Sequence, residues 1–294
     1  MKKNAKNRDS QPEWVTSFLN AQEGLTNDAT RKFQKIIYSY YKKYGRTFPW
    51  RETTNPYHIL VSEFMLQQTQ TERVTQKYEQ FVTTFPDFHS LASASLQKVL
   101  GVWSGLGYNR RALNLKKTAE IVVTQYSSVL PSSPDVLMTL PGIGKATAGA
   151  VAAFAFGSPV AFVETNIRTV FIYFFFRGKN DVNDKEILPL VEKTLDYTNP
   201  REWYYALMDY GVMLKKQYRN FGKKSAHYTK QAPFKGSDRQ IRGMILKTLL
   251  ERACVTEPEL VKILCATPGR VREILAQLEK EGFISREGTV ITIA

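Results

Sequence analysis

Residues 140–150, LPGIGKATAGA, restrict the possible folds of this chain more than any other segment. Two closely spaced glycines, Gly142 and Gly144, predict a tight turn with positive φ between two helices. The second helix is expected over Lys145–Phe156, and its first N–H groups have no acceptor within the helix. Such donors attract phosphate together with the helix dipole. The segment therefore predicts a grip on a phosphate backbone that contacts no bases, as suits a protein that handles DNA of any sequence.

The overall composition agrees with a polyanionic partner. The chain has 294 residues, of which 43% are hydrophobic, and a formal net charge of +14. This length allows one or two domains with a real core, and the charge favours a polyanion such as DNA. Two cysteines, Cys254 and Cys265, exclude a disulfide framework and a cysteine-based metal cage. We therefore expect a reducing, cytoplasmic setting, and no apolar run approaches the roughly 20 residues of a membrane span.

Helical periodicity dominates the first 214 residues. Residues 1–24 are expected to form a flexible basic tail. No convincing strand alternation occurs before about residue 280, so the body is predicted to be mostly α. Besides Lys145–Phe156, helices are expected over Thr26–Tyr44, Pro56–Thr69, Glu72–Phe85, Arg110–Tyr126, Asn166–Phe176, Lys185–Tyr197 and Arg201–Leu214.

Two segments with different composition and pattern follow residue 214. Residues 215–236 contain many basic side chains and no acidic one, and we expect a basic linker that is either solvated or in contact with phosphate. Helices are then expected over Asp238–Glu251, Glu257–Leu264 and Pro268–Glu281, followed by two short strands around Gly288. This order is typical of a winged helix-turn-helix domain, which we expect at residues 237–294. Its nearly balanced charge leaves open whether it binds DNA or docks against the body or a partner.

Four segments, one of which contains the hairpin, occur in collinear order: FPWRETTNPYHILVSEFMLQQTQ at 48–70, WSGLGYNRRALNL at 103–115, LPGIGKATAGAV at 140–151 and FVETNIRTV at 162–170. Together they strongly resemble the helix-hairpin-helix (HhH-GPD) DNA glycosylases, and within these the adenine DNA glycosylases of the MutY type. The resemblance implies a two-lobed helical domain, placed at residues 25–214, with a cleft between the lobes. There a base flipped out of double-stranded DNA would lose its N-glycosidic bond.

Two carboxylates are candidates for this chemistry. Breaking a bond to deoxyribose passes through an oxocarbenium-like state, for which an acid and an anion are both useful. Glu63 lies on an apolar helix that should raise its pKa, and the resemblance implies that it protonates a ring nitrogen of adenine. Glu164 stands where the family has Asp, and the resemblance implies that it stabilises the sugar cation, with Asn166 in support. The alternatives are a solvent-facing Glu63 and a Glu164 that only caps the following helix.

The extra methylene of Glu164 is a departure from the family pattern. A displacement of about 1 Å in a catalytic group can lower the rate about 100-fold. A shifted backbone, a different substrate or a low activity would each account for the substitution.

The resemblance also implies which residues contact DNA. Gln67, Gln68 and Thr69 match a segment that fills the gap beside the opposite base, and Tyr108 matches an aromatic wedge between stacked bases. Ala146 stands where bifunctional relatives carry a Schiff-base lysine, so a monofunctional enzyme without β-lyase activity is expected. Further candidate DNA contacts are Arg51, Arg110, Arg111, Gly142, Gly144, Lys145 and Thr147.

Two other departures limit what the resemblance implies. Relatives hold an iron–sulfur cluster with four cysteines after the segment MDYGVML, whereas this chain has Lys215 there and only two cysteines, which cannot ligate a [4Fe–4S] cluster. The domain with which adenine glycosylases sense 8-oxoguanine is not evident. No organic cofactor is implied, and the hairpin carbonyls are candidates to hold Na⁺ or K⁺, as in relatives. Because relatives act as monomers, we expect a monomer.

These features predict a base-excision-repair DNA glycosylase that acts on double-stranded DNA containing a mismatch or lesion. We expect it to remove a mispaired purine, adenine opposite guanine or 8-oxoguanine. One alternative is a glycosylase for another base, such as thymine or uracil opposite guanine or a modified purine. The other is a non-catalytic DNA-binding lesion sensor or regulator.

Overall fold

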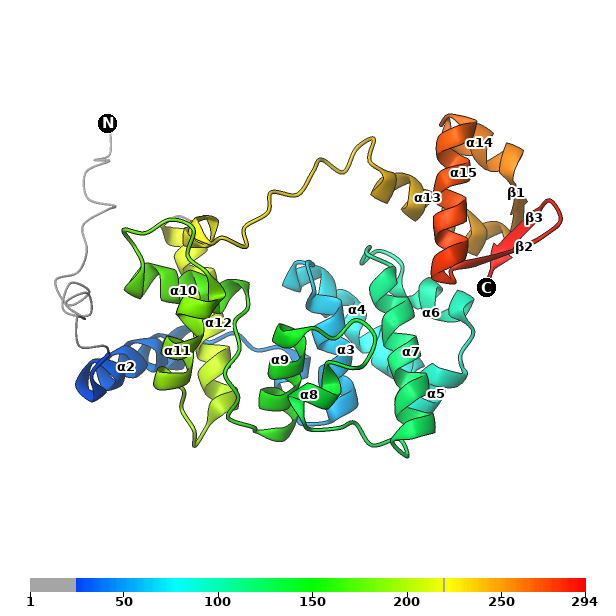
Figure 1. Cartoon of the computed structure of the whole chain (residues 1–294). Coiled ribbons are helices and arrows are strands. Elements are labelled where there is room, and N and C mark those ends of the chain that lie inside the picture. The colour runs from blue at the N-terminus through cyan, green and yellow to red at the C-terminus, as the bar shows by residue number, and fades with distance from the viewer. Residues whose placement is uncertain (1–24, 219) are drawn as a thin grey trace. The chain divides into compact units, whose positions relative to one another are not determined.

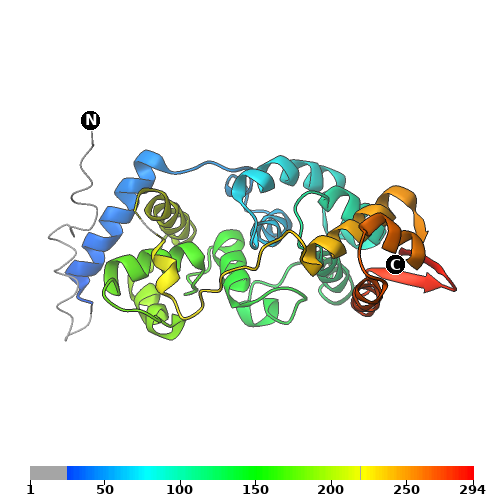
Figure 2. The ribbon, with the colours of Figure 1, turned by 90° about the horizontal axis from the view of Figure 1, so that it is seen from above.

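A computed structural model describes residues 25–218 and 220–294, so the predicted tail 1–24 and Arg219 lie outside the described residues. The fold is mostly helical, which confirms the predicted fold class. Chain contacts divide it into two compact units. One unit comprises residues up to Thr54 together with Gly144–Thr229, and the other comprises Asn55–Ile143 together with Lys230–Ala294 (Figures 1 and 2). Of the helices described, none has the length and apolar character that crossing a bilayer requires.

The first unit is organised by two packed helices, α10 (Thr165–Phe175) and α12 (Pro200–Gln217). Aromatic side chains join them to α2 (Asn27–Tyr44): the ring centroid of Phe33 lies 5.0 Å from that of Phe174 and 5.8 Å from that of Trp203. These edge-to-face contacts stabilise the core beyond the burial of area alone. The remaining elements of this unit are α9 (Lys145–Phe156), α11 (Asp184–Thr194) and the short 3₁₀ helices Pro49–Arg51 and Phe221–Lys224.

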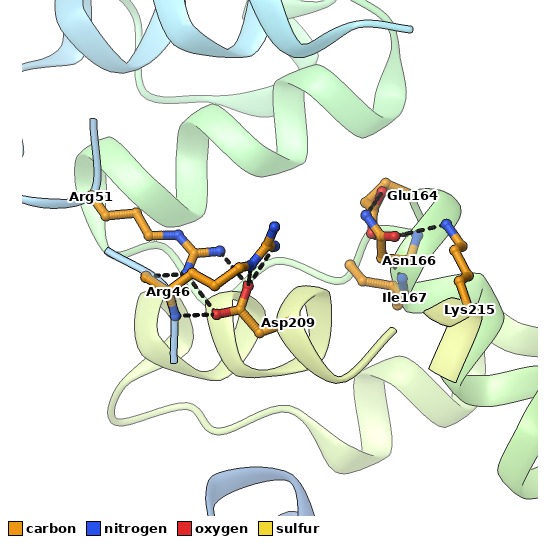
Figure 3. Close-up of polar contacts among 7 residues, drawn as sticks. All are labelled: Arg46, Arg51, Glu164, Asn166, Ile167, Asp209 and Lys215. Atoms are coloured by element: carbon orange, nitrogen blue, oxygen red, sulfur yellow. Dashed lines mark hydrogen bonds and ion pairs between the residues drawn. The ribbon is translucent and has the colours of Figure 1, made fainter. Parts of the chain in front are cut away.

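A buried carboxylate ties the loop after α2 to α12. Asp209 accepts a hydrogen bond from the backbone N–H of Arg46 at 2.7 Å and from the guanidinium groups of Arg46 and Arg51 at 2.6–3.0 Å (Figure 3). Burial alone would raise the pKa of Asp209, but the hydrogen bonds from both arginines and the charge of Arg51 outweigh it and hold the pKa below its ordinary value. The Arg51 side chain is only 7% exposed and is engaged in this cluster. It therefore serves the core of the unit, and a contact of Arg51 with DNA stays a prediction.

The second unit contains a helical layer formed by Asn55–Ile143. In it α5 packs against α7, and α3 packs against both α4 and α7. Trp103 is fully buried, its ring lies edge-on to Phe81 at 5.7 Å, and its indole N–H donates to the carbonyl of Gly107 at 3.1 Å. The helices of this layer are α3 (Pro56–Leu66), α4 (Thr71–Thr84), α5 (Phe88–Ser93), α6 (Leu96–Trp103), α7 (Arg110–Gln125) and α8 (Pro134–Leu137).

The C-terminal part of the same unit combines three helices with a small sheet. The strands are antiparallel in the order β1-β3-β2. The predicted helices and the final two strands are present, whereas β1 was not predicted, and the winged-helix assignment itself stays a prediction. The elements are α13 (Asp238–Arg252), β1 (Cys254–Thr256), α14 (Glu257–Leu264), α15 (Pro268–Glu281), β2 (Ile284–Glu287) and β3 (Val290–Ile293).

The segment expected to be a basic linker is partly folded into the first unit. Lys215 and Lys216 belong to the last turn of α12, which continues three residues beyond the predicted end. Phe221 is buried, and its ring centroid lies 5.1 Å from that of Tyr173 on α10. Burial of this aromatic ring fixes the first half of the segment, while residues 226–236 are exposed.

We expect Asp209→Asn to lower the free energy of unfolding by about 3 kcal/mol at neutral pH, because it leaves a buried arginine without its counter-charge. The folded-state pKa of Asp209 is depressed, so its stabilising contribution is complete above the unfolded-state pKa and is lost as the pH falls through the folded-state pKa. Urea unfolding at neutral and acidic pH measures this. The difference between wild type and variant should shrink in acid.

The control for this experiment is Asp28→Asn, which removes an exposed ion pair with Lys32 on α2. Exposed pairs contribute little to stability, so this variant should unfold like the wild type. An Asp209→Asn variant that is as stable as Asp28→Asn would contradict the role given to the buried cluster.

Candidate functional site

The predicted hairpin lies between α8 and α9, and its conformation depends on Gly142. This residue has a φ of +79°, in the left-handed region that side chains disfavour. A Cβ added there would lie 2.8 Å from Asn114 Nδ2 and 3.0 Å from the Phe64 ring. The turn is fixed from α7 by the hydroxyl of Thr118, which donates to the carbonyl of Pro141 at 3.1 Å. Glycine is therefore required at this position.

Gly144 differs from its prediction. Its φ is −95° and its ψ is 177°, so its backbone is extended and the expected positive φ is wrong here. Gly144 is the N-cap of α9 and offers no side-chain oxygen to the first turn, and both Gly144 and Lys145 are exposed, with Thr147 half-buried. The start of α9 is thus accessible to an anion such as phosphate. The carbonyl of Gly142 accepts a hydrogen bond from Gln67 Nε2 at 3.3 Å, and a Na⁺ or K⁺ ion at the hairpin stays a prediction.

Glu164 is the N-cap of α10, and its side chain folds back onto the first turn of that helix (Figure 3). Its Oε1 accepts hydrogen bonds from the backbone N–H groups of Asn166 at 2.6 Å and Ile167 at 2.8 Å. Its Oε2 accepts one from the Asn166 side-chain amide at 3.2 Å. Glu164 therefore caps α10. Capping does not oppose a chemical role, because it also fixes where the carboxylate lies.

The Glu164 carboxyl is electrostatically perturbed. Burial raises its pKa, while the N–H groups of Ile167 and Asn166 and the positive charge of Lys215 favour the anion and oppose this rise. Burial has the larger effect, so the pKa lies above the ordinary value for Glu. Carboxyl groups under such opposing influences are enriched at functional sites.

Lys215 completes this cluster and was not among the predicted site residues. Its Nζ donates to Asn166 Oδ1 at 2.7 Å, so the ammonium orients the amide whose Nδ2 faces Glu164 (Figure 3). Burial lowers the pKa of Lys215, and the charge of Glu164 opposes this change. One sequence signal could have identified it: a lysine directly after the segment MDYGVML, where the resemblance described above places the cysteine loop.

Glu63 occupies the apolar helix α3, as predicted. Its neighbours Ser62 and Phe64 are buried, and Glu63 itself is half-buried. The expected rise of its pKa stays a prediction.

Arg111 organises two loops through its guanidinium group. It is 7% exposed, and its guanidinium donates to the carbonyls of Phe64, Met65 and Gln67 at 2.6–2.9 Å and of Gly107 at 3.0 Å. Burial lowers the pKa of Arg111 to about 10, which leaves it charged at neutral pH. Arg111 thus holds the end of α3 against the loop before α7, and its contact with DNA stays a prediction.

The loops held by Arg111 line a cavity of about 960 Å³ in the second unit. Gln68 and Tyr108 have φ values of 54° and 49°, a strained conformation that is frequent at functional sites. Thr69 is half-buried and is not among the residues that line the cavity. The predicted DNA-binding residues that the cavity brings together are Gln67, Gln68, Tyr108, Arg110 and Arg111.

Metal-ligating side chains do not gather in residues 25–218 or 220–294: no group of three or more His, Cys, Asp or Glu could hold a metal ion there. Cys254 and Cys265 are exposed free thiols. The prediction that a [4Fe–4S] cluster is absent depends on the number of cysteines in the sequence.

Comparison with known proteins gives a family match and several relatives. Residues 61–194 match the model described as "HhH-GPD superfamily base excision DNA repair protein". The adenine DNA glycosylase of Mycolicibacterium smegmatis is 31% identical over 269 residues, which cover 85% of this chain and 92% of that protein. That of Buchnera aphidicola subsp. Baizongia pistaciae is 37% identical over 190 residues, which cover 63% of this chain but only 53% of that relative. The structure of a thermostable thymine-DNA glycosylase is similar with a TM-score of 0.59 and 28% identity, over 64% of this chain and 88% of that one.

We expect Gly142→Ala to lower the free energy of unfolding by about 1–3 kcal/mol, because alanine is strained at positive φ and its methyl group would collide with Asn114. Gly144→Ala is the matched control, since its φ is ordinary and no atom lies within 4 Å of the added Cβ. Urea unfolding of the two variants measures the difference. Equal stabilities would show that the hairpin does not depend on Gly142.

Proposed function

The chain belongs to the HhH-GPD superfamily of base excision DNA repair proteins, and from this premise we propose that it is a DNA glycosylase that removes a mispaired purine from double-stranded DNA. The observation that carries the proposal is the cluster of Glu164, Asn166 and Lys215 at the start of α10, within the segment that the resemblance assigns to catalysis. Similarity to adenine DNA glycosylases favours adenine as the excised base, opposite guanine or 8-oxoguanine.

In the proposed reaction the target base is first extruded, because its glycosidic bond is inaccessible in a stacked duplex. Neutral Glu63 transfers its proton to a ring nitrogen of the purine, which makes the base a better leaving group. The bond between C1′ and the base nitrogen then breaks, its electron pair leaves with the base, and the sugar becomes an oxocarbenium ion. Water adds to C1′ and releases a proton, which restores the acid.

Glu164 supplies the anion that stabilises this cation. Two backbone N–H groups of α10 occupy Oε1, whereas Oε2 accepts only the Asn166 amide among the hydrogen bonds described. We therefore place Oε2 toward the sugar. Lys215 positions Asn166 and favours the charged form of Glu164.

The product is an abasic site, and the strand is not nicked. Ala146 has no amine with which to form a Schiff base. Lys145 precedes it on α9 but projects about 100° away around the helix, where we propose that it contacts phosphate. The hairpin holds the backbone, while Gln67, Gln68 and Tyr108 occupy the space beside the extruded nucleotide, and the protein acts as a monomer.

A second candidate substrate is thymine or uracil opposite guanine. The similarity to a thymine-DNA glycosylase structure, at 28% identity and a TM-score of 0.59, supports this second substrate. A protein that binds mismatched DNA without cleaving it is the remaining alternative.

The test is a single-turnover excision assay on duplexes that contain adenine opposite guanine, adenine opposite 8-oxoguanine, thymine or uracil opposite guanine, or a modified purine. We expect release of adenine, and Glu63→Gln should lower the rate by at least about 100-fold because it removes the proton donor. Glu79→Gln, at an exposed position on α4, is the control and should retain the wild-type rate.

Each other outcome of this assay has a defined meaning. Release of thymine without adenine would replace the proposed substrate. Release of no base from any duplex would favour a DNA-binding protein. An unchanged rate in Glu63→Gln would remove the proposed acid and leave the family assignment intact.

The role of Lys215 predicts a change in pH dependence. Its charge lowers the pKa of Glu164, so Lys215→Met should raise that pKa and move the acidic limb of the excision rate to higher pH. Lys216→Met, exposed in the same turn of α12, should leave the limb in place. A Lys215→Met variant with lower stability but an unmoved limb would show that Lys215 is only structural.

A further inference from the structure

The cavity of the second unit has a wall that the proposed function leaves unused. One side is formed by the loops that contain Gln68 and Tyr108, which the proposed function already places beside DNA. The other side is formed by residues 231–234 and by α13, from which Arg239 and Arg242 line the cavity. All of these residues belong to one compact unit.

This cavity is positively charged. No acidic side chain lines it within the described residues. Arg110 and Arg242 both pair with Glu281, so two guanidinium groups share one carboxylate. Arg242 Nη1 is buried and has no hydrogen-bond partner within the part of the chain described. The arginines that line the cavity with Arg111 are Arg73, Arg110, Arg239 and Arg242.

Tyr108 connects the two walls. Its hydroxyl accepts hydrogen bonds from Arg239 Nη1 at 3.0 Å and from Gln231 Nε2. The Arg239 guanidinium carbon lies 5.9 Å from the ring centroid of Tyr108 and 6.0 Å from that of Phe234, which is 60% exposed. An exposed aromatic ring offers a stacking surface to a base, and guanidinium groups match the geometry of phosphate.

We propose that α13 and residues 231–234 complete a binding pocket for an unpaired nucleotide of DNA, with its base against Tyr108 and its phosphate on Arg239 and Arg242. The proposal rests on the proposed function in one respect: extrusion of the target base is what leaves the opposite nucleotide unpaired. A cavity of about 960 Å³ accommodates a nucleotide with an adjoining phosphate, within the usual range of ligand sites. The C-terminal part of the chain thus acts in DNA recognition through α13.

The test measures dissociation constants by fluorescence anisotropy for two duplexes. One is fully paired, and the other carries a single nucleotide opposite a tetrahydrofuran abasic analogue, which no glycosylase can process. The wild type should bind the second duplex more tightly. Arg239→Ala should lower this preference about tenfold, the size expected for one charge-assisted hydrogen bond. The slope of log Kd against the logarithm of the salt concentration should fall by about 0.9, because one phosphate contact is lost.

Two further variants keep this experiment interpretable. Arg252→Ala lies on the same helix but is exposed and outside the cavity, so it should retain the preference. Gln231 lies in an exposed segment that the core does not need, so Gln231→Ala repeats the test without disturbing the fold. Thermal melting of each variant checks that the fold is retained.

Several outcomes overturn the proposal. Equal affinity of the wild type for both duplexes does so, as does an unchanged preference in Arg239→Ala. Tighter binding by Arg239→Ala also does so, since Arg239 would then close the cavity against DNA. If no base is excised but the Arg239-dependent preference is present, the proposed function fails and the pocket stands. If adenine is excised but the preference is absent, only the pocket fails.

Discussion

The carboxylate of Glu164 caps a helix and, in the proposed reaction, also stabilises the sugar cation. Its Oε1 caps α10, so the carboxylate cannot move without exposing the backbone donors of a helix that forms the core of its unit. Lys215 reaches Asn166 because the end of α12 packs against α10. Helix packing, capping and the counter-charge are therefore one arrangement, and the chemistry proposed for Glu164 depends on all three.

The second unit meets a different requirement, which is to hold strained loops in place. Gln68 and Tyr108 adopt positive φ without being glycine, and such conformations persist only where surrounding contacts impose them. Arg111 provides those contacts with hydrogen bonds to carbonyls at the end of α3 and before α7. A buried arginine thus supports residues that the proposed function places against DNA.

Local signals in the sequence were enough for most helices. Lys145–Phe156, Glu257–Leu264 and Pro268–Glu281 have the predicted bounds, because caps, glycines and apolar periodicity all act within one element. Helices α5, α6 and α8 were missed, since four to eight residues give too few turns for a periodic pattern. Partners distant in the chain decided the remaining cases: Arg51 is committed to Asp209, 158 residues away, and Lys215 to Asn166, 49 residues away. The spacing of the two hairpin glycines does not determine their dihedral angles, so the sequence did not reveal that Gly144 is extended.

The hydrogen bonds of Arg111 restrict how this protein can evolve. Two nitrogens of one rigid guanidinium, Nη1 and Nη2, donate to several carbonyls at once, and a lysine, with a single nitrogen, would satisfy fewer of them. Substitution would leave buried oxygens unpaired and release both loops together. The carbonyls around position 111 therefore restrict it to arginine.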